Sequence, residues 1–104
     1  MSETLLKDLI IEKLKTVYDP EVPSDIWELG LVYDIRFPKS DEVIIEMTLT
    51  APGCPIADEL VQQVHDVVLE VEGINSVTVD LVFEPMWTPD RMSEIAKLEL
   101  GYGL

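Results

Sequence analysis

Cys54 is the only cysteine in the 104-residue chain, and its neighbours favour a reactive thiol. The surrounding segment, residues 47–56, predicts the end of a strand, a Pro-Gly turn and the first turn of a helix. Pro55 suits the first helical position, because its missing N–H would be unpaired there in any case. Cys54 would then lie at or near the N-cap, where unpaired backbone N–H groups and the helix dipole stabilise a thiolate.

A thiolate at this position could bind a thiophilic metal, carry sulfur as a persulfide or attack an electrophile. The alternative is that Cys54 is a small buried hydrophobic residue at a tight turn. Asp58 and Glu59 fall in the same first turn of the helix and would oppose thiolate formation unless they point away. Function is nevertheless best sought around this sulfur atom.

Asp19 and Glu21 are candidate neighbours of the cysteine. Residues two apart on an extended segment point to the same side, so both carboxylates would face the cysteine turn if their loop packs there. The alternative is that they are solvated charges in a loop interrupted by Pro20 and Pro23. Thr50, on the polar face of the preceding strand, could hydrogen-bond the cysteine turn or serve the sheet alone.

Trp27 and Trp87 are candidates for a surface that contacts other proteins. Exposed aromatic side chains are enriched at the centres of protein interfaces. Packing is the alternative for both. Trp27 could pack against the loop that contains Asp19 and Glu21, and Trp87 could anchor the loop that enters the last helix.

Acid–base chemistry has few candidate residues in this chain. His65 is the sole histidine and follows Cys54 by eleven residues on the same expected helix. On a continuous helix the two would be roughly 16 Å apart, which excludes a cysteine–histidine dyad within one chain. No glycine-rich phosphate loop follows a strand, and no Ser/His/Asp set is available. We therefore expect a protein that is not an enzyme.

Composition limits the remaining classes. The chain has 21 acidic and 7 basic residues and a net charge of −14, which repels phosphate backbones, so we expect no nucleic-acid partner. No apolar run approaches the roughly 20 residues of a membrane span, and the N-terminus does not read as a signal peptide. One cysteine excludes an intrachain disulfide and fits a reducing cytoplasm, where we expect the protein to act. Without a linker or repeat, residues 1–104 should form a single domain.

Apolar spacing predicts three helices and three strands in the order α-β-β-α-β-α. The expected helices are residues 3–17, a segment from the Cys54 turn to Gly73, and a segment capped by Thr88 with Pro89 in its first turn and ended by Gly101. The expected strands are residues 31–37, 43–50 and 77–83, with a hairpin loop at 38–42 between the first two. Ser24 could cap a short turn over residues 25–28 that Gly30 ends.

A strand–helix–strand succession implies a right-handed crossover and a parallel pair, so the sheet should be mixed. Each strand presents one strongly apolar face, and helices should cover that face only. The predicted fold is therefore α+β, a two-layer sandwich with a small mixed three-stranded sheet and helices on one face.

Four motifs occur in order along the chain: Asp19-Pro20-Glu21, Leu29-Gly30-Leu31-Val32-Tyr33, the segment at 47–55 that contains Pro-Gly-Cys-Pro, and Trp87-Thr88-Pro89-Asp90-Arg91-Met92. Together they resemble the SufT/PaaD-type family of metal–sulfur cluster biosynthesis proteins over nearly the whole chain. One departure is Glu84-Pro85-Met86-Trp87, where the family typically has Asp-Pro-Pro-Trp.

The resemblance implies a role in assembling iron–sulfur clusters or delivering them to client apoproteins. Cys54 would be the working thiol and a possible metal or cluster ligand, with Asp19, Glu21 and Thr50 in support. Common iron–sulfur sites use about four cysteines, so one chain offers too few ligands. Any cluster would be held transiently, shared between two chains as in a homodimer, or completed by a partner or a small thiol. The implied partners are client apoproteins and cluster-assembly proteins.

Two other interpretations stay open. The chain could be a structural adaptor that bridges a scaffold and its clients, including a role like that of PaaD-type relatives in phenylacetate degradation, without handling metal or sulfur. It could also be a thiol or sulfur-transfer enzyme, which is the least favoured because no local base is evident.

Overall fold

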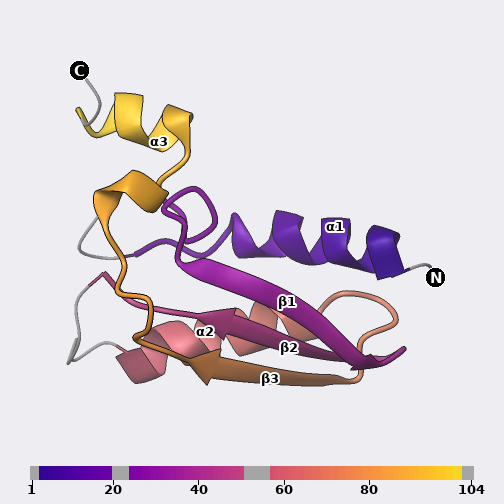
Figure 1. Cartoon of the computed structure of the whole chain (residues 1–104). Helices are drawn as coiled ribbons and strands as arrows, with labels where there is room; N and C mark the ends of the chain where they lie inside the picture. Colours follow the sequence, from indigo (N-terminus) through magenta and orange to yellow (C-terminus); the bar gives the residue numbers. More distant parts are fainter. Residues whose placement is uncertain (1–2, 20–23, 51–56, 102–104) are drawn as a thin grey trace.

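The computed structural model of the protein describes residues 3–19, 24–50 and 57–101. Along these residues the elements follow in the order α1 (Glu3–Leu14), β1 (Val32–Lys39), β2 (Glu42–Met47), α2 (Ala57–Leu69), β3 (Ser76–Leu81), the short 3₁₀ helix η1 (Pro89–Arg91) and α3 (Glu94–Glu99) (Figure 1). Apart from η1, this is the predicted order α-β-β-α-β-α. The α+β class is therefore confirmed.

The sheet has the strand order β1-β2-β3, with β1 antiparallel to β2 and β2 parallel to β3. The mixed sheet expected from the strand–helix–strand succession is thus confirmed. The hairpin between β1 and β2 is tighter than the predicted loop 38–42, because Pro38 and Lys39 extend β1 and leave a turn at Ser40 and Asp41. Within the described sheet β1 is an edge strand, where a proline removes no ladder hydrogen bond.

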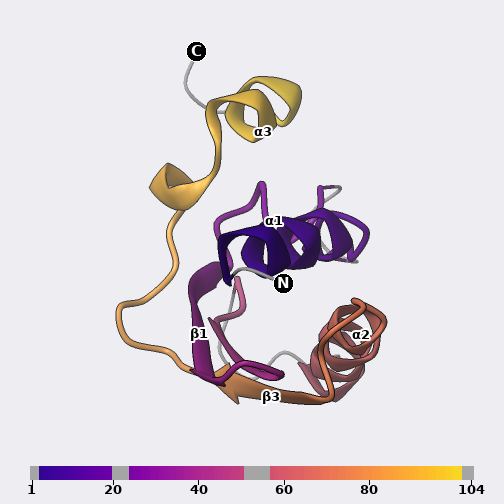
Figure 2. The same cartoon turned by 90° about the vertical axis from the view of Figure 1, so that its right-hand side faces the viewer.

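Both long helices lie on the same face of the curved sheet (Figure 2). Burial in β2 alternates residue by residue, whereas α1 and α2 bury every fourth residue, so each element shows the period of its type. The buried side chains of the two layers form one core: Leu6, Ile10 and Leu14 of α1, Val43, Ile45 and Met47 of β2, and Leu60, Val64 and Val68 of α2. This core fixes the position of β2, and the segment that leaves β2 carries part of the candidate site.

The first helix differs from its predicted bounds of 3–17, because α1 ends at Leu14. The Val17 amide donates to the Leu14 carbonyl three residues back, at 3.2 Å, so the chain tightens and leaves the helix. Leu5 and Leu9, expected on the apolar stripe, are 47% and 37% exposed. The reason is that α1 contacts the core through one narrow row of side chains, and the neighbouring row faces outward.

The last predicted helix, residues 89–100, is interrupted. Thr88 does precede a helical turn that begins at Pro89, but that turn is the short η1, and the Thr88 side chain makes no capping hydrogen bond. Met92 then adopts an extended backbone with its side chain buried. Ser93 caps the separate helix α3, its side chain accepting the Ala96 N–H at 3.1 Å. Figure 1 places α3 beyond the end of the sheet, away from the layer formed by α1 and α2.

Candidate functional site

A run of backbone hydrogen bonds joins the loop after α1 to the end of β2. The Ile26 N–H donates to the Val17 carbonyl at 2.9 Å, and the Leu31 N–H donates to the Ile26 carbonyl at 3.1 Å. The Thr48 N–H, one residue past β2, then donates to the Leu31 carbonyl at 2.8 Å. The base of the loop that contains Asp19 is therefore attached to the segment that leaves β2.

Asp19 and Thr50 both lie close in sequence to the ends of this run of bonds. Asp19 is 5% exposed, and its N–H donates to the Ser24 carbonyl at 3.2 Å. That burial argues against the alternative in which Asp19 is a solvated loop charge. Thr50 is half-buried, while its neighbour Thr48 is only 1% exposed. Asp19 and Thr50, two of the predicted site residues, thus lie on segments that backbone hydrogen bonds join together.

Cys54 and Glu21, the other two residues of the predicted site, lie outside the described residues. That Cys54 caps the second helix therefore stays a prediction. The described part of α2 begins at Ala57, and Asp58 and Glu59 in its first turn are both exposed. Solvent screens charges in such positions, which weakens their opposition to a nearby thiolate.

Asp25 is a structural residue of this end of the molecule that sequence reasoning missed. Its side-chain Oδ1 accepts the N–H groups of Trp27 at 3.1 Å and of Glu28 at 3.0 Å. Asp25 rather than Ser24 therefore caps the short turn, which Gly30 ends with a φ of +75° as expected. The signal was present in the sequence, because aspartate is a strong N-cap residue whose oxygen accepts from the second and third residues that follow.

The segment of residues 84–93, which we name the C-terminal strap, packs directly on this turn. The Ser93 N–H donates to the Glu28 carbonyl at 2.7 Å, and the Trp87 Nε1–H donates to the Leu29 carbonyl at 2.7 Å. At Gly30 the approach is closest, since an added Cβ would lie 2.1 Å from the Arg91 carbonyl oxygen. Only glycine fits there without moving the strap.

Tyr33 on β1 holds the same strap by two further contacts. Its hydroxyl donates to the Pro85 carbonyl at 2.8 Å, and the Arg91 guanidinium lies over its ring at 4.5 Å from the centroid. A cation in this position is attracted to the face of the ring. The second and fourth sequence motifs, residues 29–33 and 87–92, are therefore in contact with each other, although they are far apart in sequence.

These contacts support the packing alternative for both tryptophans. Trp87 is half-buried and its indole N–H is used by Leu29, so it anchors the strap. Trp27 is half-buried against the core and lines a hollow of about 100 Å³ together with Lys7 and Tyr33. Contact of either tryptophan with a client protein stays a prediction.

His65 lies well along α2, which is continuous from Ala57 to Leu69. It follows Ala57 by eight residues, or about 12 Å along the helix axis. Its Nδ1 lies 3.1 Å from Asp66 Oδ1, and this hydrogen bond holds the pKa of the Asp66 carboxyl below its usual value. His65 is thus paired with its own neighbour on the helix surface.

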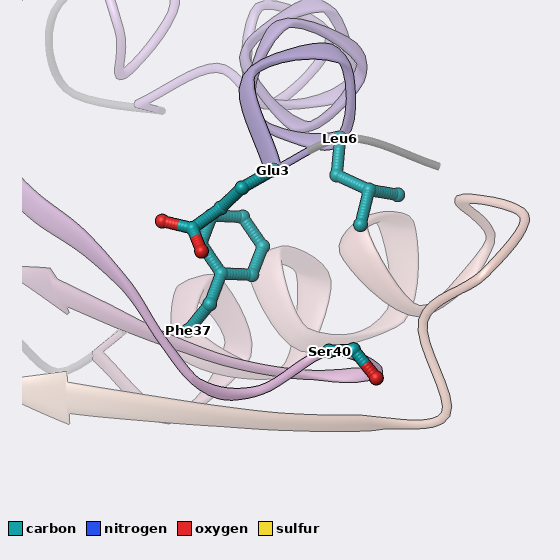
Figure 3. Close-up of a pocket in the computed structure, with 4 residues that line it drawn as sticks. All are labelled: Glu3, Leu6, Phe37 and Ser40. Carbon is teal, nitrogen blue, oxygen red and sulfur yellow. The ribbon is translucent and has the colours of Figure 1, made fainter.

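A hollow of about 210 Å³ lies at the other end of the molecule, between the start of α1 and the β1–β2 hairpin (Figure 3). Glu3, Leu6, Phe37 and Ser40 line it. None of the predicted site residues is among these four. Among residues 3–19, 24–50 and 57–101, no group of three or more His, Cys, Asp or Glu side chains is placed to hold a metal ion.

None of the helices in the described parts of the chain is long and apolar enough to cross a membrane.

Comparison with known proteins identifies the family. Residues 7–81 match the model of a family described as "Iron-sulfur cluster assembly protein". An Fe-S protein maturation auxiliary factor from Porphyromonas gingivalis is 47% identical over 93 residues, which is 89% of each chain. The Fe-S protein maturation auxiliary factor SufT from Staphylococcus aureus is 41% identical over 85 residues, covering 82% of this chain and 97% of that protein.

A solved structure from Bacillus anthracis, titled as a domain of unknown function, superimposes on the fold with a TM-score of 0.88. It is 37% identical in sequence and covers 94% of this chain and 93% of its own. These matches confirm the resemblance to SufT/PaaD-type proteins that the four motifs indicated. The chain belongs to the iron–sulfur cluster assembly protein family.

Proposed function

We propose that the chain is a maturation factor for iron–sulfur proteins, acting as a carrier or targeting protein for client apoproteins with Cys54 as its working thiol. The observation that carries the proposal is the similarity of nearly the whole chain to proteins named as Fe-S protein maturation auxiliary factors, at 47% identity over 89% of both chains for one of them. The aligned length of 93 residues spans the positions of all four motifs.

The arrangement at the end of β2 supports this proposal chemically. A buried carboxylate at Asp19 and a half-buried hydroxyl at Thr50 are held on connected segments, with Cys54 four residues beyond Thr50 in sequence. A thiolate is the ligand that iron in clusters prefers, and a carboxylate is a harder oxygen ligand that could complete the coordination of iron. A cargo held by one thiolate and weaker oxygen ligands can be passed on.

The single thiol also sets how the cargo would be held. Because common cluster sites use about four cysteine ligands, we propose that a cluster binds transiently, or is shared between two chains or with a partner. The protein would act on its clients as a carrier rather than as an enzyme. Thiols stay reduced in the cytoplasm, which favours that compartment as the site of action of a working thiol.

The proposal is tested in cells of the source organism from which the gene for this chain has been deleted. We expect the activities of iron–sulfur enzymes, each normalised to the amount of enzyme protein, to fall and to return when the full chain is supplied. Enzymes without clusters in the same extracts are the control and should keep their activities. Unchanged activity of iron–sulfur enzymes in the deletion strain would remove the maturation role.

A structural adaptor is the second candidate. The observation that favours it is the exposure of large apolar side chains on α3, where Ile95 is 63% and Leu98 is 65% exposed. An adaptor would need such a contact surface and no thiol, so the two candidates differ in their dependence on Cys54.

A further inference from the structure

A third hollow, of about 260 Å³, lies between α3 and the segments that end at Tyr18 and begin at Ser24. Its lining residues are Tyr18, Ser24, Asp25, Glu28, Ile95, Ala96 and Glu99. Ala96 is the buried contact of α3, and Ser24 and Asp25 belong to the capped turn. The walls of the hollow therefore include residues that the fold fixes in place, among them the same turn that holds the C-terminal strap.

Large apolar side chains at and near this hollow are mostly exposed to solvent and are not part of the buried core. Of the residues that line it, Tyr18 is 59% exposed and Ile95 is 63% exposed. Leu98 does not line the hollow but lies one turn further along α3 from Ile95, and it is 65% exposed. The helix itself is anchored by Ala96, which is 1% exposed. Large side chains that contribute little to their own fold, grouped around a hollow, are typical of an interaction surface.

Among the described residues that line the hollow, the charged side chains are all acidic: Asp25, Glu28 and Glu99. Asp25 Oδ1 is used in capping the turn, whereas Glu28 is half-buried and Glu99 is exposed. An apolar patch with a carboxylate rim complements side chains that combine an aliphatic stem with a positive charge. Tyr18 adds an aromatic face suited to a guanidinium group.

We propose that this surface, formed by Tyr18, Glu28, Ile95, Leu98 and Glu99, binds a basic amphipathic segment of a partner protein. Leucine-like side chains of the segment would cover Ile95 and Leu98, and its arginines or lysines would pair with Glu28 and Glu99. A second copy of this chain is a poorer occupant, because two chains of net charge −14 would bring like charges together. The surface includes Tyr18, the residue before Asp19, so a partner bound there lies beside this one residue of the proposed site. The inference concerns partner binding and stands whether or not Cys54 handles clusters.

The test uses the full chain and a synthetic 14-residue helical peptide, with leucines on one face and arginines on the other, at physiological salt. Binding is followed by fluorescence anisotropy of the labelled peptide and by backbone amide shifts of the isotope-labelled protein. We expect the largest amide shifts at Tyr18, Glu28, Ile95 and Glu99. Ile95→Ser should weaken binding about tenfold, because an apolar contact of that size is lost. Glu99→Gln should weaken it about threefold, as an exposed ion pair does.

Matched variants separate this surface from general attraction to an acidic protein. Leu69→Ser removes an apolar side chain that is 40% exposed on α2, and Glu72→Gln removes an exposed acid elsewhere. Both should bind like the unaltered chain, and a peptide with glutamates in place of arginines should not bind. Equal weakening by both sets of variants, amide shifts centred elsewhere, or no binding of the arginine peptide would each overturn the proposal. So would a change of oligomeric state in Ile95→Ser, measured by sedimentation, since it would assign the surface to a second copy.

Discussion

Replacing Cys54 with alanine is expected to reduce the maturation of client iron–sulfur enzymes to the level of cells that lack the protein. The reason is that Cys54 is the only cysteine, so the chain holds no second thiol that could bind iron or carry sulfur in its place. The fold should persist, with the free energy of unfolding changed by no more than about 1 kcal/mol, because the substitution removes a single sulfur atom.

The measurement compares client enzyme activities in deletion cells that express the unaltered chain or Cys54→Ala at equal amounts. Ser76→Ala is the matched control, since it also trims a small side chain to alanine, at an exposed position of β3. Full client activity with Cys54→Ala would exclude the carrier role and leave the adaptor. Loss of activity together with loss of folded protein would be detected by thermal unfolding of the purified variants.

The second large effect is expected for Gly30→Ala, which should destabilise the protein by about 3 kcal/mol or more. Two causes add. Gly30 has a φ of +75°, a conformation that costs a residue with a Cβ about 1 kcal/mol. The new Cβ would also lie 2.1 Å from the Arg91 carbonyl oxygen, so the strap must move and strain the hydrogen bonds of Trp87 and Ser93.

Gly101→Ala separates these two causes, because Gly101 has a φ of +82° but, among the described residues other than its chain neighbours, no atom lies within 4 Å of the added Cβ. It should cost only about 1 kcal/mol. Both variants are measured by urea unfolding against the unaltered chain. If Gly30→Ala costs no more than Gly101→Ala, the close packing of the strap on the turn is not a source of stability.

The elements that sequence predicted best are those with long, regular apolar patterns. The second helix was predicted from its four-residue spacing, and Leu60, Val64 and Val68 are indeed its buried residues. The strand predicted over residues 43–50 from its alternation lies at Glu42–Met47, and the structure keeps that alternation in Val43, Ile45 and Met47. In both cases the local preference and the position of the core agree, so the pattern alone is sufficient.

The C-terminal region could not be predicted in the same way. A single helix from Pro89 onward satisfies local capping rules, but Met92 is buried and the Ser93 N–H donates to the Glu28 carbonyl. Those contacts join residues about sixty positions apart, and no local pattern encodes them. The same limit applies to Leu5 and Leu9, whose exposure depends on which face of α1 the rest of the fold covers.

For the candidate site, sequence supplied the residues and the structure supplied part of their placement. Asp19 could equally have been a solvated charge, and only the fold shows its burial. Asp25 was overlooked in favour of Ser24, although both are good capping residues, because their choice depends on where the turn begins. The positions of Cys54 and Glu21 stay predictions.

The central claim, that Cys54 is a working thiolate at the start of the second helix, is tested most directly by its alkylation rate as a function of pH. A single cysteine makes the signal unambiguous in the unmodified 104-residue chain. We expect the midpoint of the rate profile to lie below the ordinary thiol pKa of about 8.5, because helix N–H groups stabilise the thiolate. A midpoint at or above that value, or a thiol that reacts only when the protein is unfolded, would contradict the account.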